Sequence, residues 1–201
     1  MKKILSLITL LVFCNILSSY AMVERWTNSD NINPNTWYYA YFKDDFNDDT
    51  NDPYMICTTN GTFSNSIETN AESLYLLSFT KYKNNSPSIF TISILEYGYL
   101  PFKDYTGMFK ASIKYNGEVY EYPFVLYVYD FKDFNHIVIS ESENSELYHI
   151  LLYLLTAKID FKLRLEKYSS LGISYNNSYI CEVPATNFSE IYNAIYTNAN
   201  N

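Results

Sequence analysis

Apolar and polar residues alternate along much of the chain, as they do in β-strands with one face in a core and the other in water. In the clearest run, four apolar residues alternate with four charged ones between Ile159 and Glu166. We therefore expect a half-buried strand there. Similar β-rich runs predict strands at 37–42, 54–59, 73–79, 89–97, 109–115, 118–124, 125–129, 137–140 and 179–183.

The dipeptide Asn116-Gly117 lies between two alternating segments and predicts a hairpin with a two-residue type I′ turn. This turn pairs Tyr115 with Glu118, Ile113 with Tyr120, Ala111 with Tyr122 and Phe109 with Phe124. Beyond the turn these pairs form one apolar face, so turn chemistry and alternation agree. We expect the second strand to bend or break near Pro123, which has no N–H to donate. A second dipeptide of this kind, Asn60-Gly61, predicts a turn that ends the strand 54–59.

Two segments have the spacing of helices. Leucine and isoleucine recur every three or four residues from Leu147 to Leu155, after potential caps at 142–145, which predicts a helix at about 145–157. A capping-box-like start at Asn187–Glu190 predicts a final helix at about 188–197. The chain shows no alternation of strands with helices. The sequence therefore predicts a mainly β (α+β) fold, an antiparallel β-sandwich of nine or ten short strands with two packed helices.

The first 21 residues have the three-part pattern of a cleavable signal peptide. A positive start is followed by an apolar run of about 14 residues and by small residues before Ala21. Because a membrane-spanning helix needs roughly 20 apolar residues, we expect cleavage and no stable membrane insertion afterwards. The chain is thus predicted to be exported, to the periplasm or the outside of the cell. Residues 22–36 are polar and expected to be irregular, and 37–201 to form a single β-rich domain.

The composition excludes some classes of partner. The 201 residues include 14 Lys and Arg against 22 Asp and Glu, a formal net charge of −8. Removing residues 1–21, with Lys2 and Lys3, would deepen it to −10. Nucleic-acid binding needs basic clusters, so we expect no nucleic-acid partner. The 22 Tyr and 13 Phe supply enough apolar bulk for a folded core.

The cysteines predict one disulfide bond. Cys14 lies within the predicted signal peptide, which leaves Cys57 and Cys181 in the exported chain. In an oxidising compartment we expect these two to form a bridge. The alternative is a pair of buried free thiols.

The segment 44–53 is strongly acidic and is the candidate metal site. Asp45, Asp48, Asp49 and Asp52 supply the oxygen ligands that calcium prefers. The segment lacks the glycine and the final glutamate of an EF-hand loop, so the alternative is a solvated acidic loop. Calcium is the one cofactor that the sequence suggests.

No set of residues points to catalysis. The only histidines, His136 and His149, lack the neighbouring ligands of a zinc motif. Three glutamates between 141 and 146 offer carboxylates for acid–base chemistry, but a helix N-terminus explains them equally well. Nucleophile-elbow, P-loop and dinucleotide-binding motifs are absent from the sequence. We therefore assign no catalytic residue.

Aromatic residues give the candidate binding surface. Tyr38, Tyr39 and Tyr41 cluster near Trp37 in one predicted strand, and Tyr127 and Tyr129 share one face of another. Exposed Tyr and Trp favour protein and glycan contacts; packing in the core is the alternative. The leading hypothesis is a non-enzymatic exported module that binds a protein or glycan partner. The alternatives are an envelope glycan-acting enzyme with unassigned carboxylates and a calcium-stabilised surface domain.

The order of elements resembles that of small exported sandwich proteins of bacterial envelopes, including the invasion-associated-locus type. Trp37, Cys57, the Asn116-Gly117 hairpin and Cys181 carry this resemblance. It implies a β-sandwich in the cell envelope, and it assigns no site residues.

Overall fold

The computed structural model describes residues 33–43, 49–82, 87–95, 108–125, 127–131, 134–168 and 174–197. The predicted signal peptide lies outside these residues, as do 22–32 of the predicted irregular segment. No helix among the described residues is long and apolar enough to cross a membrane.

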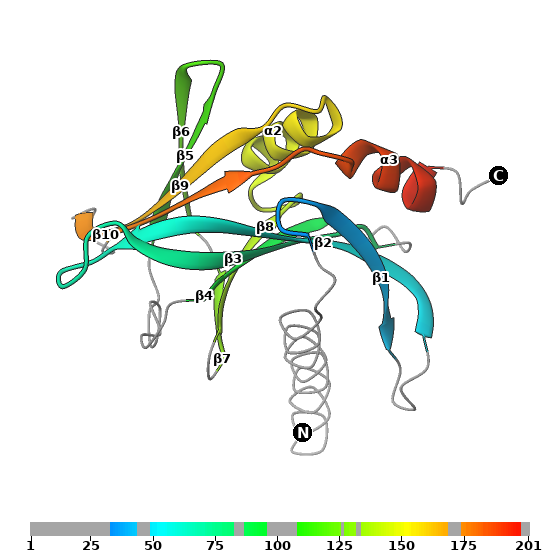
Figure 1. The fold of residues 1–201 in the computed structure, drawn as a ribbon, viewed down its shortest axis with the longest axis horizontal. Coiled ribbons are helices and arrows are strands. Elements are labelled where there is room, and N and C mark those ends of the chain that lie inside the picture. The colour runs from blue at the N-terminus through cyan, green and yellow to red at the C-terminus, as the bar shows by residue number, and fades with distance from the viewer. Residues whose placement is uncertain are drawn as a thin grey trace.

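The described chain is built mainly of strands, with two helical segments late in the sequence (Figure 1). The elements are β1 (Trp37–Lys43), β2 (Asp49–Ser64), β3 (Ala71–Thr80), β4 (Ile89–Leu95), β5 (Met108–Tyr115), β6 (Glu118–Val125), β7 (Tyr127–Phe131), β8 (Phe134–Ser140), α2 (Ser145–Thr156), β9 (Phe161–Tyr168), β10 (Ser174–Val183) and α3 (Phe188–Tyr192), which continues as the π-helical turn η1 (Asn193–Thr197). The predicted mainly β fold with two helices is confirmed, and both helices lie where periodicity places them.

The strands form one antiparallel sheet in the order β6-β5-β9-β10-β2-β3-β4-β8-β7. Strand β1 lies outside this order and pairs with β2. Strands β6 and β7 lie at opposite ends of this order, yet one residue separates Val125 from Tyr127. Because their Cα atoms can be at most about 7 Å apart, the two ends of the sheet meet there. The sheet therefore curls, and α2 and α3 pack together against its inner face (Figure 1).

Alternation along the strands separates the core from the outer face. In β9, Phe161, Leu163 and Leu165 are buried and the residues between them are largely exposed. The buried residues meet the apolar stripe of α2, which includes Leu151 and Leu155. On the outer face charged side chains form ion pairs, namely Lys110–Glu121, Lys162–Glu182 and Arg164–Glu166.

The hairpin at Asn116-Gly117 has the predicted register throughout, from Tyr115 opposite Glu118 to Phe109 opposite Phe124. Both turn residues have positive φ, 51° for Asn116 and 85° for Gly117, as a type I′ turn requires. Strand β6 continues through Pro123 and ends at Val125. A proline is tolerated there because β6 has a strand partner on one side only.

The turn predicted at Asn60-Gly61 is wrong, because β2 runs without interruption from Asp49 to Ser64. Asn60 and Gly61 lie within the ladder, opposite Leu74 and Ser73 of β3. A Cβ atom on Gly61 would lie 2.2 Å from the Ile180 carbonyl oxygen and 2.5 Å from Cε2 of Tyr75. The glycine therefore serves a close approach between strands rather than a turn.

Candidate functional site

Trp37 belongs to the core, which corrects its assignment to a binding surface. Its side chain is 1% exposed. The indole N–H donates to the Pro184 carbonyl oxygen at 2.7 Å, and the ring packs edge-on against Phe188 at 4.9 Å. Trp37 is covered because β1 begins where β10 ends and α3 starts. Sequence reasoning missed this, since both covering residues are about 150 positions away.

The neighbouring tyrosines of β1 are exposed. Tyr39 is 52% exposed and Tyr41 39% exposed. Their rings lie edge to face with centroids 6.1 Å apart. Tyr38 is half-buried, and its hydroxyl accepts a hydrogen bond from the Asn33 N–H at 2.9 Å. Of the predicted aromatic cluster, Tyr39 and Tyr41 are therefore the exposed members.

The second predicted aromatic pair lies elsewhere in the sheet. Tyr127 and Tyr129 belong to β7, and β2, β3, β4 and β8 separate that strand from β1 along the sheet. The side chains of this pair lie outside the described part of the structure. The sheet order thus does not place the two predicted groups on neighbouring strands.

Further tyrosines gather at the same end of the sheet as Tyr41. Tyr196 of η1 donates its hydroxyl proton to the carbonyl oxygen of Pro53, the residue opposite Tyr41, at 2.9 Å. Tyr192 packs against Tyr196 with ring centroids 5.4 Å apart. Tyr82 follows β3 and is 42% exposed; its pKa is raised by burial and by Asp52. We call the exposed residues Tyr39, Tyr41 and Tyr82 the tyrosine surface; Tyr192 is half-buried and Tyr196 is buried.

Asn187 fixes the start of β1 rather than capping α3. Its Oδ1 accepts from the Trp37 N–H at 3.0 Å, and its Nδ2 donates to the Trp37 carbonyl at 2.9 Å. A residue of a neighbouring strand would make this same pair of bonds. Asn187 has a left-handed φ of 54° and makes no side-chain cap bond. The predicted capping role is therefore corrected, because the carboxamide is occupied by β1.

The main chain of β1 has an open edge beyond Trp37. Along a strand, alternate residues direct their N–H and C=O groups to the same side, so Tyr39 and Tyr41 direct theirs to the side of Asn187, away from β2. Within the described residues β1 pairs with β2 alone. A register shift between Tyr41 and Lys43 interrupts the regular pairing of β1 with β2. We call the Tyr39–Tyr41 stretch the open edge.

The acidic segment follows the open edge in the sequence. Five aspartates occur between 44 and 52. Of the candidate calcium ligands, Asp45 and Asp48 lie outside the described residues, whereas Asp49 and Asp52 belong to β2 rather than to the predicted loop. Among the residues with described positions, no group of three or more His, Cys, Asp and Glu is placed to hold a metal ion.

The two cysteines are free, so the predicted Cys57–Cys181 bridge is not formed in this structure. Cys181 lies opposite Gly61, four residues along β2 from Cys57. A disulfide between neighbouring strands needs closely opposed Cα atoms, less than about 7 Å apart, and this register does not pair the two cysteines. Burial raises the pKa of Cys57 to about 12 and also raises that of Cys181. Both thiols are therefore held in the unreactive protonated form.

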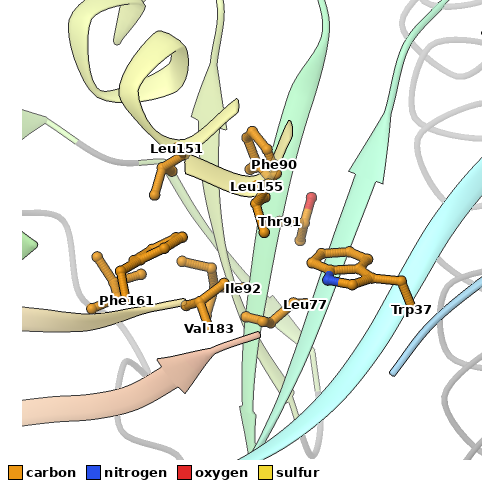
Figure 2. A pocket seen from close by; sticks show the side chains of 10 residues that line it. Trp37, Leu77, Phe90, Thr91, Ile92, Leu151, Leu155, Phe161 and Val183 are labelled. Atoms are coloured by element: carbon orange, nitrogen blue, oxygen red, sulfur yellow. The ribbon is translucent and has the colours of Figure 1, made fainter. Parts of the chain in front are cut away.

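The space between α2 and the sheet holds a small apolar cavity (Figure 2). Its volume is about 20 Å³, and its walls include Trp37, Leu77, Leu151, Leu155 and Val183. A water molecule needs at least about 10–15 Å³ and several polar partners. This cavity has the volume for one water but almost no polar wall, so it is a packing void and does not accommodate an organic ligand.

The remaining catalytic candidates have structural roles or stand apart. His149 is exposed on α2 beside the ring of Tyr148, while His136 lies in β8 and its side chain is outside the described set. Glu141 accepts a hydrogen bond from the Ser88 N–H at 3.1 Å, which ties the start of β4 to the end of β8. This carboxylate therefore holds two segments together.

Comparison of the chain with protein-family models, with curated proteins and with solved structures finds no match. The candidate site accordingly rests on the geometry of the tyrosine surface and the open edge.

Proposed function

We propose that this protein is an exported, non-enzymatic binding module whose tyrosine surface contacts a protein or glycan partner in the periplasm, in the cell envelope or outside the cell. One observation carries the proposal. Tyr39 and Tyr41 present exposed, adjoining rings on a strand with a single strand partner in the described sheet. Tyrosine offers a large contact area at a low cost in conformational entropy, which suits a recognition surface.

The local packing supports a role in binding. Near the exposed rings, Tyr192 packs against Tyr196, and Tyr196 is bound to the carbonyl of Pro53, the residue opposite Tyr41. Lys81 lies 5.6 Å from the centre of the Tyr192 ring, which adds a cation–π contact. A surface held in this way is preorganised, so little conformational freedom is lost when a partner binds.

The apolar cavity between α2 and the sheet is too small for an organic ligand. The void between α2 and the sheet is about 20 Å³, whereas ligand pockets measure roughly 300–1,000 Å³. The proposed export rests on the sequence pattern of residues 1–21.

The test compares Tyr39→Ser/Tyr41→Ser with Tyr153→Ser in the protein purified from cells that express the full chain. Tyr153 is a matched control, since it is 57% exposed but lies on α2. Binding would be measured to envelope fractions of the source cells and to a glycan array. We expect the double variant to lose at least about 10-fold in affinity and the control to keep its binding. Equal binding by both variants would remove the tyrosine surface from the proposal.

A further inference from the structure

We propose that the open edge of β1 binds an extended, basic peptide segment of a partner protein, which adds to the sheet as a further strand. This inference rests on the proposed function and specifies the class of partner and its binding mode. Strand addition to a sheet edge is a recurrent mode of peptide recognition, in which main-chain bonds give affinity and alternate side chains give specificity.

Asn187 shows that this edge is able to hold an amide. Its carboxamide donates to the Trp37 carbonyl and accepts from the Trp37 N–H. Tyr39 and Tyr41 follow at the two-residue spacing of a ladder, and each offers one donor and one acceptor on the same side. An added strand would therefore continue the pattern that the side chain of Asn187 begins.

The side chains along this edge are suited to an apolar strand. Proline and charged residues, with which natural edge strands commonly prevent pairing, are absent from Trp37–Phe42; the one charged residue of β1 is Lys43 at its end, beyond the register shift. On one face lie the exposed rings of Tyr39 and Tyr41. On the other face Tyr38, Ala40 and Phe42 pack against a small apolar cluster of the sheet. Alternate residues of an added strand would thus meet apolar groups on both faces.

Pairing with another strand is blocked or disturbed at the two ends of the edge but not along Tyr39–Tyr41. Asn187 occupies the first position, at Trp37, and a register shift between Tyr41 and Lys43 interrupts the regular ladder near the other end. An irregularity of this kind bends a strand and disrupts its pairing locally. The available stretch is therefore short, which favours a peptide over a broad sheet-to-sheet contact.

Charge selects the class of peptide. Two aspartates of β2 lie beside the end of the edge: Asp49 is opposite Lys43, and the exposed Asp52 precedes Pro53, the residue opposite Tyr41. The chain as a whole has a formal net charge of −8, which disfavours a second copy of itself as the occupant. A peptide with Lys or Arg beside its apolar positions would complement both features.

The experiment starts from a phage-displayed library of random 12-residue peptides, selected on the protein purified after export of the full chain. The peptides recovered are then measured against Tyr39→Pro and Tyr39→Thr. Proline removes the outward N–H of the edge and the ring, whereas threonine removes the ring alone. The bonds between β1 and β2 do not involve this N–H, so both variants are expected to fold, which circular dichroism and thermal unfolding would check.

We expect alternating apolar peptides with Lys or Arg, bound about 5- to 10-fold more weakly by Tyr39→Pro than by Tyr39→Thr, as the loss of one main-chain hydrogen bond implies. Methylating the peptide nitrogens that face the edge should abolish binding. Failure to recover any peptide would overturn the inference. So would equal affinity for the two variants.

Two outcomes separate this inference from the proposed function. If the proline and threonine variants bind equally but Tyr39→Ser/Tyr41→Ser still loses its envelope or glycan partner, the tyrosine surface stands and strand addition fails. If sedimentation shows a dimer that Tyr39→Pro converts to a monomer, the occupant is a second copy and the peptide proposal is wrong.

Discussion

Replacing Gly61 by alanine should destabilise the protein through overpacking. Gly61 lies where β2 is flanked on both sides, opposite Ser73 of β3 and Cys181 of β10. The added Cβ would come within 2.2 Å of the Ile180 carbonyl oxygen and 2.5 Å of the Tyr75 ring. Neither neighbour moves easily. The oxygen belongs to a strand, and the Tyr75 hydroxyl donates to the Thr62 carbonyl at 2.7 Å.

The size of the effect follows from three contributions. Overpacking costs about 1–3 kcal/mol, and weakening one hydrogen bond between β2 and β10 adds about 1 kcal/mol. Replacing glycine in a strand returns roughly 0.5–1 kcal/mol. We therefore expect the free energy of unfolding of Gly61→Ala to fall by about 2 kcal/mol. In a chain of this size, that lowers the melting temperature by about 4–8 °C.

Guanidinium unfolding followed by tyrosine fluorescence would measure this loss. Asn60→Ala is the control, because Asn60 adjoins Gly61 in β2 but is exposed, and its change should stay within about 0.5 kcal/mol. The variant Gly61→Asn distinguishes the two possible reasons for a glycine here, close packing between strands and a left-handed turn. A left-handed turn tolerates asparagine, whereas the larger side chain should be worse than alanine in the packed strand. The reasoning is refuted if Gly61→Ala resembles the control or if asparagine is the better substitute.

Three further changes probe the core, the β1 clamp and the thiols. Leu155→Ala, at a 1% exposed position beside the apolar void, should cost about 3 kcal/mol or more in chemical unfolding, against less than about 1.5 kcal/mol for Leu155→Met. Asn187→Gly keeps the left-handed backbone but loses both bonds to Trp37, so it should lower the unfolding free energy by about 1–3 kcal/mol; an unchanged midpoint would contradict the clamp. Cys57 should resist Ellman's reagent at pH 8 until the protein is unfolded. Burial raises the folded pKa of Cys57 from the ordinary 9.0 to about 12, so the stability that the protonated thiol contributes is present below pH 9 and is lost between pH 9 and 12. Denaturation midpoints measured against pH should therefore fall over this range, and they should fall less steeply in Cys57→Ala.

The parts of the fold that sequence predicted are those specified by residues close together in the chain. The register of the β5–β6 hairpin follows from Asn116-Gly117 and from the alternation on either side, so no distant contact is needed to find it. Helix α2 follows in the same way from the spacing of leucines between 147 and 155. In both places local propensity and packing agree, which makes such predictions reliable.

The predictions that failed concern residues whose partners are distant in sequence. Gly61 is needed because Ile180 approaches it from β10, whereas its own neighbours suggest a turn. Trp37 is buried by Pro184 and Phe188, although it begins a strand with two exposed tyrosines. The pairing of strands β2 and β10 decides both cases. A single sequence does not reveal that pairing, because alternation identifies a strand without identifying its neighbour.

The expected bridge between the cysteines also depended on partners that are distant in the sequence. Two cysteines in a predicted export compartment suggest a bridge, but a bridge depends on register as well as on compartment. Cys181 lies opposite Gly61 rather than Cys57. Gly61, which the close approach of β10 requires, therefore occupies the position opposite Cys181 where a bridging cysteine would have to be.

The open edge of β1 results from the way in which two strands share one side of β2. Strand β1 covers the half from Asp49 to Cys57, and β10 covers Gly61 to Ser64. The chain must leave the sheet after β10, and the left-handed Asn187 turns it over the start of β1, where its carboxamide meets Trp37. The crossing that buries Trp37 thus also sets the limit of the open edge. Stability and binding should consequently be coupled at Asn187, whose loss would destabilise the fold while extending the edge by one residue pair.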